Sequence, residues 1–265
     1  MENQYKVPAV EQALRVMLCL AENGVSPRSL TEICEAVDIH RSKAFSILNT
    51  LNEFGFVKKY PNRGGYTLGP GLLTVTGNLL ESLSLPRIAE PVLIELAKTT
   101  QATVALGVIS EQNTYVVAQY MGAPGMGVSS PIGYVTHITY GAHGKAIAAF
   151  LPEAELEALL RTQELYFFGR PEKYQAFKLR DELAQCRRTG YALELGDIQP
   201  GMNAIATPVL DQDNYPVGYI TIVGFFPEEA ALELGPLAVE AAKAIAREAG
   251  HRVFWQNNGT RRPSH

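Results

Sequence analysis

Cysteine, tryptophan and long apolar runs are scarce in this chain of 265 residues, which holds three Cys and one Trp. Cys19, Cys34 and Cys186 are odd in number and widely spaced, which argues against a disulfide framework and against a zinc site. No apolar run approaches the roughly 20 residues that span a bilayer, and Met1 to Val7 lacks the core of a signal peptide. We therefore expect a cytoplasmic protein with no membrane partner and no metal.

Sequence motifs of catalysis are also missing. No His-Glu-x-x-His, Cys-x-x-Cys or Gly-x-Ser-x-Gly occurs. The stretch Gly141 to Lys145 resembles a phosphate loop only superficially, because Thr139 stands where a glycine is needed and Ala146 where a magnesium-binding hydroxyl is needed. His137 and His143 lie six residues apart, which is not the spacing of a helical metal site. The sequence predicts neither an enzyme nor a cofactor.

A strong positive charge, the usual sign of nucleic-acid binding, is absent, since the net charge is -4. The charges are unevenly distributed, however. Residues 1 to 70 carry 8 Lys/Arg against 7 Asp/Glu, whereas the remainder carries 15 against 20. Between Ile39 and Arg63 there are five basic residues, and Glu53 is the only acidic one. A local basic surface is therefore compatible with DNA, although Lys58 and Lys59 could also simply solubilise an edge strand.

The stretch from Ser29 to Leu68 has the order of a winged helix-turn-helix. Ser29 and Glu32 form a capping-box pattern that starts one helix. A second helix follows and ends at Gly55, and its inward residues are expected to be Ala44, Ile47, Leu48 and Leu51, with Arg41, Lys43, Ser46 and Asn49 outward. Two short strand patterns, 56–60 and 66–68, flank a turn at 61–65, which predicts a hairpin. A polar, basic helix beside a basic hairpin fits a duplex groove.

Helices are also predicted on both sides of this stretch. The first begins near Pro8, with an apolar stripe expected to face the core at Val10, Ala13, Leu14, Met17, Leu18 and Ala21. A nearly apolar helix follows the hairpin at Leu72 to Leu83. Its apolar surface is explained equally well by packing within the chain and by a dimer interface.

From Pro86 onward the pattern changes to helices mixed with strands. Helices are predicted at 86–100, 141–150, 152–160, 171–189 and 233–255, and strands at 102–109, 114–120, 203–210 and 217–224. This is an α+β arrangement with a mostly antiparallel sheet of about five or six strands flanked by helices. The expected organisation is a DNA-binding domain at 1–70, a linker helix at 71–85, a second domain at 86–257 and a disordered tail at 258–265.

Several motifs in this order resemble the IclR family of bacterial transcriptional regulators along nearly the whole chain. The motifs are Asp38 to Leu51, Glu53 to Val57, Gly65 to Gly69, Gly144 to Ala149, Gly190 to Ala192 and Pro200 to Val209. The resemblance implies an N-terminal winged helix-turn-helix joined by a linker helix to a GAF-like effector-binding domain. It also implies a homodimer or tetramer that binds a double-stranded DNA operator, as a repressor or an activator.

The resemblance further implies where a small-molecule effector binds. Backbone groups of Ala142 and His143 match the positions that meet an effector carboxylate. Other positions that contact the effector in the family correspond here to Glu194, Ala204, Thr221, Val223 and Thr139. Tyr140 and Tyr219 are candidates for aromatic walls of the same site. Ala204 and Val223 replace groups that can form hydrogen bonds, and Thr139 stands where histidine is common. A larger or aromatic carboxylate is therefore expected to fit better than a glyoxylate-like acid.

For DNA contact, the pattern and the resemblance together select Arg41, Ser42, Lys43, Phe45, Ser46, Asn49, Lys58 and Arg63. Ser46 stands where the family often has arginine, and Lys43 where it has threonine, so a different base preference is expected. Two other functions remain open on this reasoning. One is a metabolite-binding protein whose winged helix makes protein contacts, and the other is an enzyme that uses His143 and Glu194.

Overall fold

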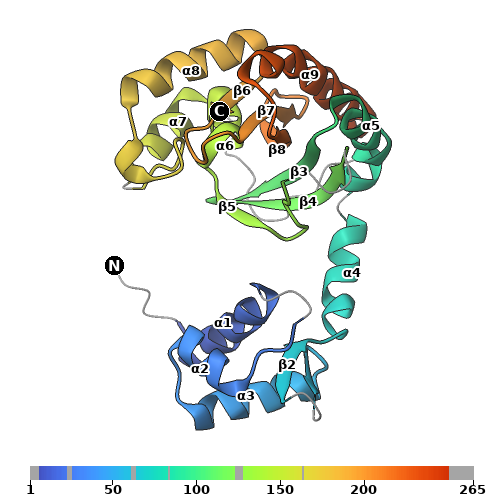
Figure 1. Cartoon of the computed structure of the whole chain (residues 1–265), viewed down its shortest axis with the longest axis vertical. Helices are drawn as coiled ribbons and strands as arrows, with labels where there is room; N and C mark the ends of the chain where they lie inside the picture. Colours follow the sequence, from blue (N-terminus) through green and yellow to red (C-terminus); the bar gives the residue numbers. More distant parts are fainter. Residues whose placement is uncertain are drawn as a thin grey trace, which may run out of the picture. The chain divides into compact units, whose positions relative to one another are not determined.

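The computed structural model describes residues 6–22, 26–60, 64–82, 84–122, 128–162 and 164–250. The chain divides into two compact units, Met1–Ser82 and Leu83–His265 (Figure 1). Arg63, residues 251–257 and the expected tail at 258–265 lie outside the described residues. The linker helix predicted at 71–85 is represented in the first unit by a helix that ends at Ser82.

The first unit has the order of elements that the sequence predicts. It consists of α1 (Pro8–Glu22), α2 (Leu30–Val37), α3 (Arg41–Glu53), β1 (Val57–Tyr60), β2 (Gly65–Leu68) and α4 (Leu72–Ser82). The capping box is present, because Ser29 Oγ accepts from the Glu32 amide at 3.3 Å and the Ser29 amide donates to Glu32 Oε2 at 2.7 Å. Asp38 adopts a left-handed conformation that ends α2 and turns the chain into α3. β1 and β2 pair antiparallel, which makes the predicted wing.

The core of this unit differs from the prediction at α1. Ile33, Ala44 and Leu48 are fully buried as expected, but α1 buries Val16, Cys19 and Leu20. Of the stripe predicted to face inward, Val10, Leu14 and Leu18 are instead exposed, between 54% and 64% accessible, whereas Met17 packs against the core as predicted. α1 carries apolar residues on two faces, and its periodicity alone does not say which face packs on α2 and α3.

The second unit is an α+β domain with a six-stranded antiparallel sheet. Its helices are α5 (Ser84–Thr100), α6 (Gly141–Phe150), α7 (Glu153–Leu160), α8 (Ala176–Thr189) and α9 (Glu228–Gly250), with one 3-10 turn at Pro171–Lys173. Its strands are β3 (Thr103–Ser110), β4 (Asn113–Met121), β5 (Val135–His137), β6 (Ala192–Leu195), β7 (Asn203–Leu210) and β8 (Pro216–Gly224), in the spatial order β5-β4-β3-β8-β7-β6.

Three elements of this unit depart from the prediction. β6 was not predicted as a strand, since four residues bounded by Gly190 and Gly196 give too short an alternation to recognise. α8 begins at Ala176 rather than at Pro171. α9 begins at Glu228, and Pro236 lies inside it, so the helix extends across a residue that usually marks a helix start.

The sheet separates two hydrophobic layers. α5 and α9 lie on one side of it, and α6, α7 and α8 lie on the other (Figure 1). Because side chains alternate along a strand, Ile220 and Ile222 of β8 face α5 and α9, whereas Tyr219, Thr221 and Val223 face the opposite side. The second group lies beside the N-terminus of α6.

Candidate ligand cavity and nucleic-acid interface

Helix α3 presents a mostly polar surface that includes the exposed ring of Phe45. All six residues selected on it for DNA contact are exposed, namely Arg41, Ser42, Lys43, Phe45, Ser46 and Asn49. His40 precedes the helix without a side-chain cap, and among the described residues the amides of Arg41 and Ser42 have no backbone acceptor. A helix N-terminus with free amides favours an anion such as a DNA phosphate.

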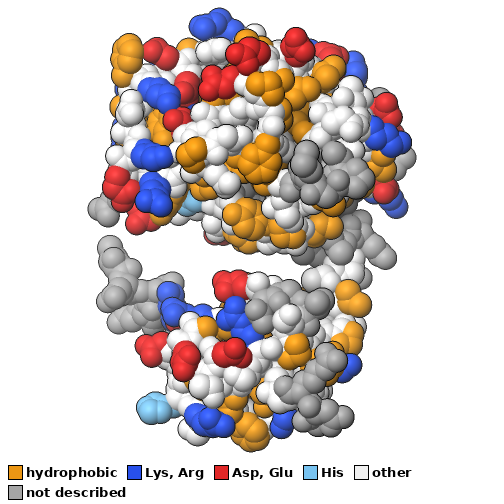
Figure 2. All heavy atoms as spheres, in the orientation of Figure 1, with side chains coloured by type: hydrophobic (Ala, Val, Ile, Leu, Met, Phe, Trp, Pro, Cys, Tyr) orange, Lys and Arg blue, Asp and Glu red, His pale blue; other side chains and the backbone are white. Residues whose placement is uncertain are grey.

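Two lysines extend this surface onto the wing. Lys58 and Lys59 are exposed on β1, and the Lys59 ammonium lies 5.7 Å from the centre of the Phe45 ring. Figure 2 shows Lys and Arg side chains together with apolar ones over α3. The Ser46 hydroxyl donates to the Ser42 carbonyl oxygen at 3.1 Å, so in this conformation only its acceptor capacity is free. Lys59 was not among the residues selected from the sequence, and the structure places it on the same exposed surface as Lys58.

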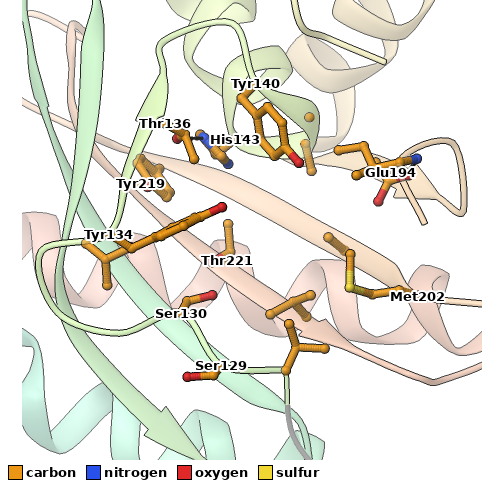
Figure 3. A pocket seen from close by; sticks show the side chains of 17 residues that line it. Ser129, Ser130, Tyr134, Thr136, Tyr140, His143, Glu194, Met202, Tyr219 and Thr221 are labelled. Atoms are coloured by element: carbon orange, nitrogen blue, oxygen red, sulfur yellow. Dashed lines mark hydrogen bonds between the residues drawn. The ribbon is translucent and has the colours of Figure 1, made fainter. Parts of the chain in front are cut away.

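A cavity of about 150 Å³ lies in the second unit beside the N-terminus of α6 (Figure 3). Eight of the nine residues named for effector binding line it, namely Tyr140, Ala142, His143, Glu194, Ala204, Tyr219, Thr221 and Val223. Thr139 does not line the cavity. It is fully buried, and its hydroxyl accepts from the Tyr166 amide at 3.0 Å and bonds His137 Nδ1 at 2.7 Å.

The N-terminus of α6 directs two free amides at this cavity. Tyr140 precedes the helix without a side-chain cap, and among the described residues the Ala142 and His143 amides have no hydrogen-bond acceptor. Gly144 allows the helix to begin here, since a Cβ at this position would lie 2.2 Å from the Thr139 carbonyl carbon. Two unpaired amides at a helix N-terminus suit a carboxylate.

One wall of the cavity is a stack of rings. The His143 ring lies parallel to the Tyr219 ring with centres 4.5 Å apart, and Tyr219 covers Gly107, where a Cβ would collide with its ring. His143 Nε2 bonds the Thr136 hydroxyl at 2.8 Å (Figure 3), and Thr114 connects Thr136 to the Tyr219 hydroxyl. Burial lowers the pKa of His143 to about 3 and raises the pKa of Tyr219 to about 12. Both rings are therefore neutral at physiological pH.

Glu194 contributes a buried carboxyl group from β6. The residue is 1% exposed, so its carboxyl group is removed from bulk solvent. Its Oε1 accepts from the Ile198 amide at 2.9 Å, whereas its Oε2 is buried without a hydrogen-bond partner. Burial raises the pKa of this carboxyl, and the Ile198 amide and the Lys145 charge oppose that shift.

The remaining lining was not found from the sequence. Ser129, Ser130, Tyr134 and Thr136 come from the segment between β4 and α6, for which the sequence predicted no site residue before Thr139. Tyr134 and Tyr140 point into the cavity from different segments (Figure 3). Ile198 and Met202 close another side. These contacts depend on long-range folding, so no local pattern in the sequence indicates them.

Two kinds of feature are not found in the described part of the chain. Among the described residues, no group of three or more His, Cys, Asp or Glu side chains is placed to hold a metal ion. Within the same residues, no helix is both long enough and apolar enough to cross a membrane.

Comparisons with known proteins identify the family. The family model described as IclR helix-turn-helix domain matches residues 9–61, and the model described as bacterial transcriptional regulator IclR C-terminal matches residues 77–248. The acetate operon repressor of Salmonella typhimurium is 26% identical over 245 residues, which cover 91% of this chain and 89% of that protein.

Solved structures agree with this match. The crystal structure of the Thermotoga maritima IclR is 27% identical, with a TM-score of 0.73 and coverage of 92% of this chain and 99% of that one. An IclR homolog from Microbacterium hydrocarbonoxydans, complexed with 4-hydroxybenzoate, is 17% identical and shares the fold, with a TM-score of 0.71 over 91% of this chain and 98% of that one. The chain thus belongs to the IclR family of bacterial transcriptional regulators.

Proposed function

We propose that the cavity beside α6 binds a small carboxylate effector and that binding changes the affinity of α3 and the wing for an operator. The observation that carries this proposal is the pair of unpaired amides, Ala142 and His143, at the wall of an otherwise largely apolar cavity. The amides would hold the carboxylate, while Ala204 and Val223 leave room for an apolar body.

The cavity volume supports a ligand with one ring. An apolar cavity of about 150 Å³ is large enough to bind benzene, and the cavity described here has about the same volume. The relative with 4-hydroxybenzoate is an instance of the same fold holding an aromatic acid of this size. A glyoxylate-like acid would leave most of the apolar surface around Ala204 uncovered, which forfeits contacts.

Thermal-shift and calorimetric titrations with benzoate, benzamide and glyoxylate test the ligand class. Benzamide has nearly the shape of benzoate without its charge, so it separates anion recognition from ring burial. We expect benzoate to bind most tightly, because it uses both the amides and the apolar body of the cavity. Equal binding of benzoate and benzamide would refute the carboxylate site at Ala142 and His143.

For the DNA interface, a gel shift with the region upstream of the encoding gene at two salt concentrations is the direct test. Binding that weakens with salt supports phosphate contacts by Arg41, Lys43, Lys58 and the wing. No shift at either salt concentration would favour the alternative in which the winged helix makes protein contacts. A ligand that binds without changing operator affinity would not be the effector.

We further infer that the first unit forms a dimer through its exposed apolar side chains. Val10, Leu14 and Leu18 form a stripe on α1, and Leu73 and Val75 on α4 are 69% and 60% exposed. The outward position of this stripe is difficult to explain in a monomer, because a contiguous exposed apolar patch marks an interface. Of the linker positions considered from the sequence, the side chains from Asn78 to Ser84 lie outside the described residues.

Sedimentation of the double variant Leu14→Lys/Leu18→Lys tests the dimer. Both side chains are already exposed, so the substitutions are expected to leave the fold intact while two charges disrupt the interface. We expect monomers with much weaker operator affinity. A single DNA-binding unit lacks the second, covalently or non-covalently linked unit whose contact with the same operator strengthens binding. The exposed Glu35→Lys change on α2 adds the same charge away from the stripe and serves as the control.

A further inference from the structure

The carboxyl group of Glu194 is incompletely satisfied in the cavity that the effector would fill. Oε1 accepts from the Ile198 amide, but Oε2 is buried and has no hydrogen-bond partner among the described residues. In the absence of ligand, water can occupy the cavity and solvate this oxygen. A ligand that displaces the water must supply a partner, since a buried unpaired carboxyl oxygen is costly.

The charged groups nearby are already engaged with other partners. Lys145 on α6 is 1% exposed, and its ammonium lies 2.7 Å from Glu182 Oε2 and donates to the Leu193 carbonyl oxygen at 3.1 Å. Lys145 attracts the Glu194 charge at longer range, but no hydrogen bond joins these two residues in the described structure. The Asp197 carboxylate, in the loop after β6, repels the Glu194 charge and is itself paired with Lys178 at 3.0 Å, whereas the Asp197 backbone amide lowers the pKa of Glu194.

Three other titratable groups on the cavity wall, His143, Tyr140 and Tyr219, are uncharged in the physiological range. His143 from α6 is an uncharged imidazole in the physiological range, since burial lowers its pKa to about 3. Tyr140, before α6, and Tyr219, on β8, have pKa values raised by burial. The strand beside β6 contributes the apolar Ala204 opposite Glu194. No cation within the described lining is therefore free to neutralise a second negative charge.

An effector carboxylate bound at the Ala142 and His143 amides would share this small cavity with Glu194. An ionised carboxylate can only accept hydrogen bonds, so two ionised carboxylates would repel each other and leave Oε2 unpaired. A protonated Glu194 resolves both problems, because its hydroxyl donates to an oxygen of the effector. Carboxyl groups that share a site commonly retain one proton for the same reason.

We propose that Glu194 is protonated, and therefore uncharged, when it binds the effector. Each effector carboxylate that binds is accompanied by one proton, which is taken from solvent onto Glu194 Oε2. The effector remains an anion, and the new Oε2–H bond donates to one of its oxygens. The ligand class is thereby narrowed to acids that bind as anions and need no hydrogen-bond donor of their own for Glu194. This inference rests on the proposed carboxylate site.

Isothermal titration calorimetry of the full-length parent protein with benzoate measures the proton directly. Titrations at one pH in buffers with different ionisation heats give the number of protons taken up. At pH values at which Glu194 is ionised in the free protein, we expect binding to take up about one proton per benzoate. In that range the affinity for benzoate should fall about tenfold for each unit by which the pH rises. Binding that is independent of pH with no proton uptake would overturn the inference while leaving the carboxylate site intact.

The variant Glu194→Gln assigns the proton to this residue. The glutamine oxygen can accept from the Ile198 amide, so its NH₂ group faces the cavity as a permanent donor that mimics the protonated acid. We expect Glu194→Gln to bind benzoate at least as tightly as the parent at neutral pH, with no proton uptake. The exposed Glu233→Gln change on α9 removes the same charge outside the cavity and should behave as the parent does.

The alternatives give different results. If Glu194 stays ionised and accepts from a ligand hydroxyl, Glu194→Gln binds 4-hydroxybenzoate more weakly than the parent does, and benzoate binding takes up no proton. Proton uptake that persists in Glu194→Gln places the proton elsewhere and overturns the inference. A parent protein that binds neither acid overturns the proposed carboxylate site and this inference with it.

Discussion

The DNA interface makes a quantitative prediction about salt. Arg41 and Lys43 lie exposed on α3 and Lys58 on β1, and each is expected to contact one phosphate. Each phosphate contact contributes about 0.9 to the slope of log affinity against log salt concentration. The triple variant Arg41→Ala/Lys43→Ala/Lys58→Ala should therefore reduce the slope by about 2.7 for each protomer bound. Between 50 and 200 mM salt, the parent should lose about 40-fold more affinity than the variant does.

Fluorescence anisotropy with a labelled duplex measures this slope, and any duplex suffices because the phosphate contribution does not depend on sequence. All three side chains are exposed, so thermal unfolding should remain nearly unchanged. The control Arg161→Ala/Arg188→Ala/Lys243→Ala removes the same charge from exposed positions of the second unit. Parallel salt dependences for parent and triple variant would refute the assignment of α3 and β1 to the DNA surface.

Three further predictions concern the second unit and its cavity. Ala204→Phe should fill the cavity and abolish the benzoate-induced thermal shift while DNA affinity is retained, since overpacking costs about 1–3 kcal/mol locally; an unchanged shift would mean that the ligand binds elsewhere. Gly144→Ala should lower the melting temperature, because its Cβ would lie 2.2 Å from the Thr139 carbonyl carbon. The control Gly77→Ala on α4 meets nothing within 4 Å and should be neutral or stabilising, and equal effects of the two changes would contradict the described packing. Because the folded-state pKa of His143 lies below its ordinary value, the unfolded chain binds more protons as pH falls below about 6.5, so acid destabilises the fold. For each unit by which the pH falls, the free energy of unfolding measured with urea should decrease by at most about 1.4 kcal/mol more for the parent than for His143→Gln. The same pH dependence for both proteins would exclude a His143 that stays neutral in this acid range.

The sequence predicts the first unit well where signals are local. The capping box at Ser29 and Glu32 and the alternation around the wing act within a few residues of each other, so they appear in the sequence as they do in the structure. The facing of α1 was wrong because two of its faces are apolar. Only the packing partners α2 and α3 select Val16 and Leu20 over Leu14 and Leu18.

In the second unit, the long apolar strands were predictable but the cavity was found mainly through resemblance. Glu194 belongs to a four-residue edge strand with no recognisable alternation, and its burial depends on α6 packing over it. Tyr134 and Thr136 reach the cavity through pairing of β5 with β4, which no local pattern specifies. Thr139 was selected by its position in the family, yet its hydroxyl fixes the backbone before α6 instead of lining the cavity.

The order of the strands places residues from both edges of the sheet in the lining of the cavity. Thr136 lies on β5 and Glu194 on β6, and these are the two outermost strands of the six. Edge strands are held on one side only, so their amides are ordinarily the first in a sheet to open and exchange with solvent. A ligand bound between Thr136 and Glu194 would connect the two edge strands β5 and β6. The local opening of one edge strand would then be coupled to the local opening of the other.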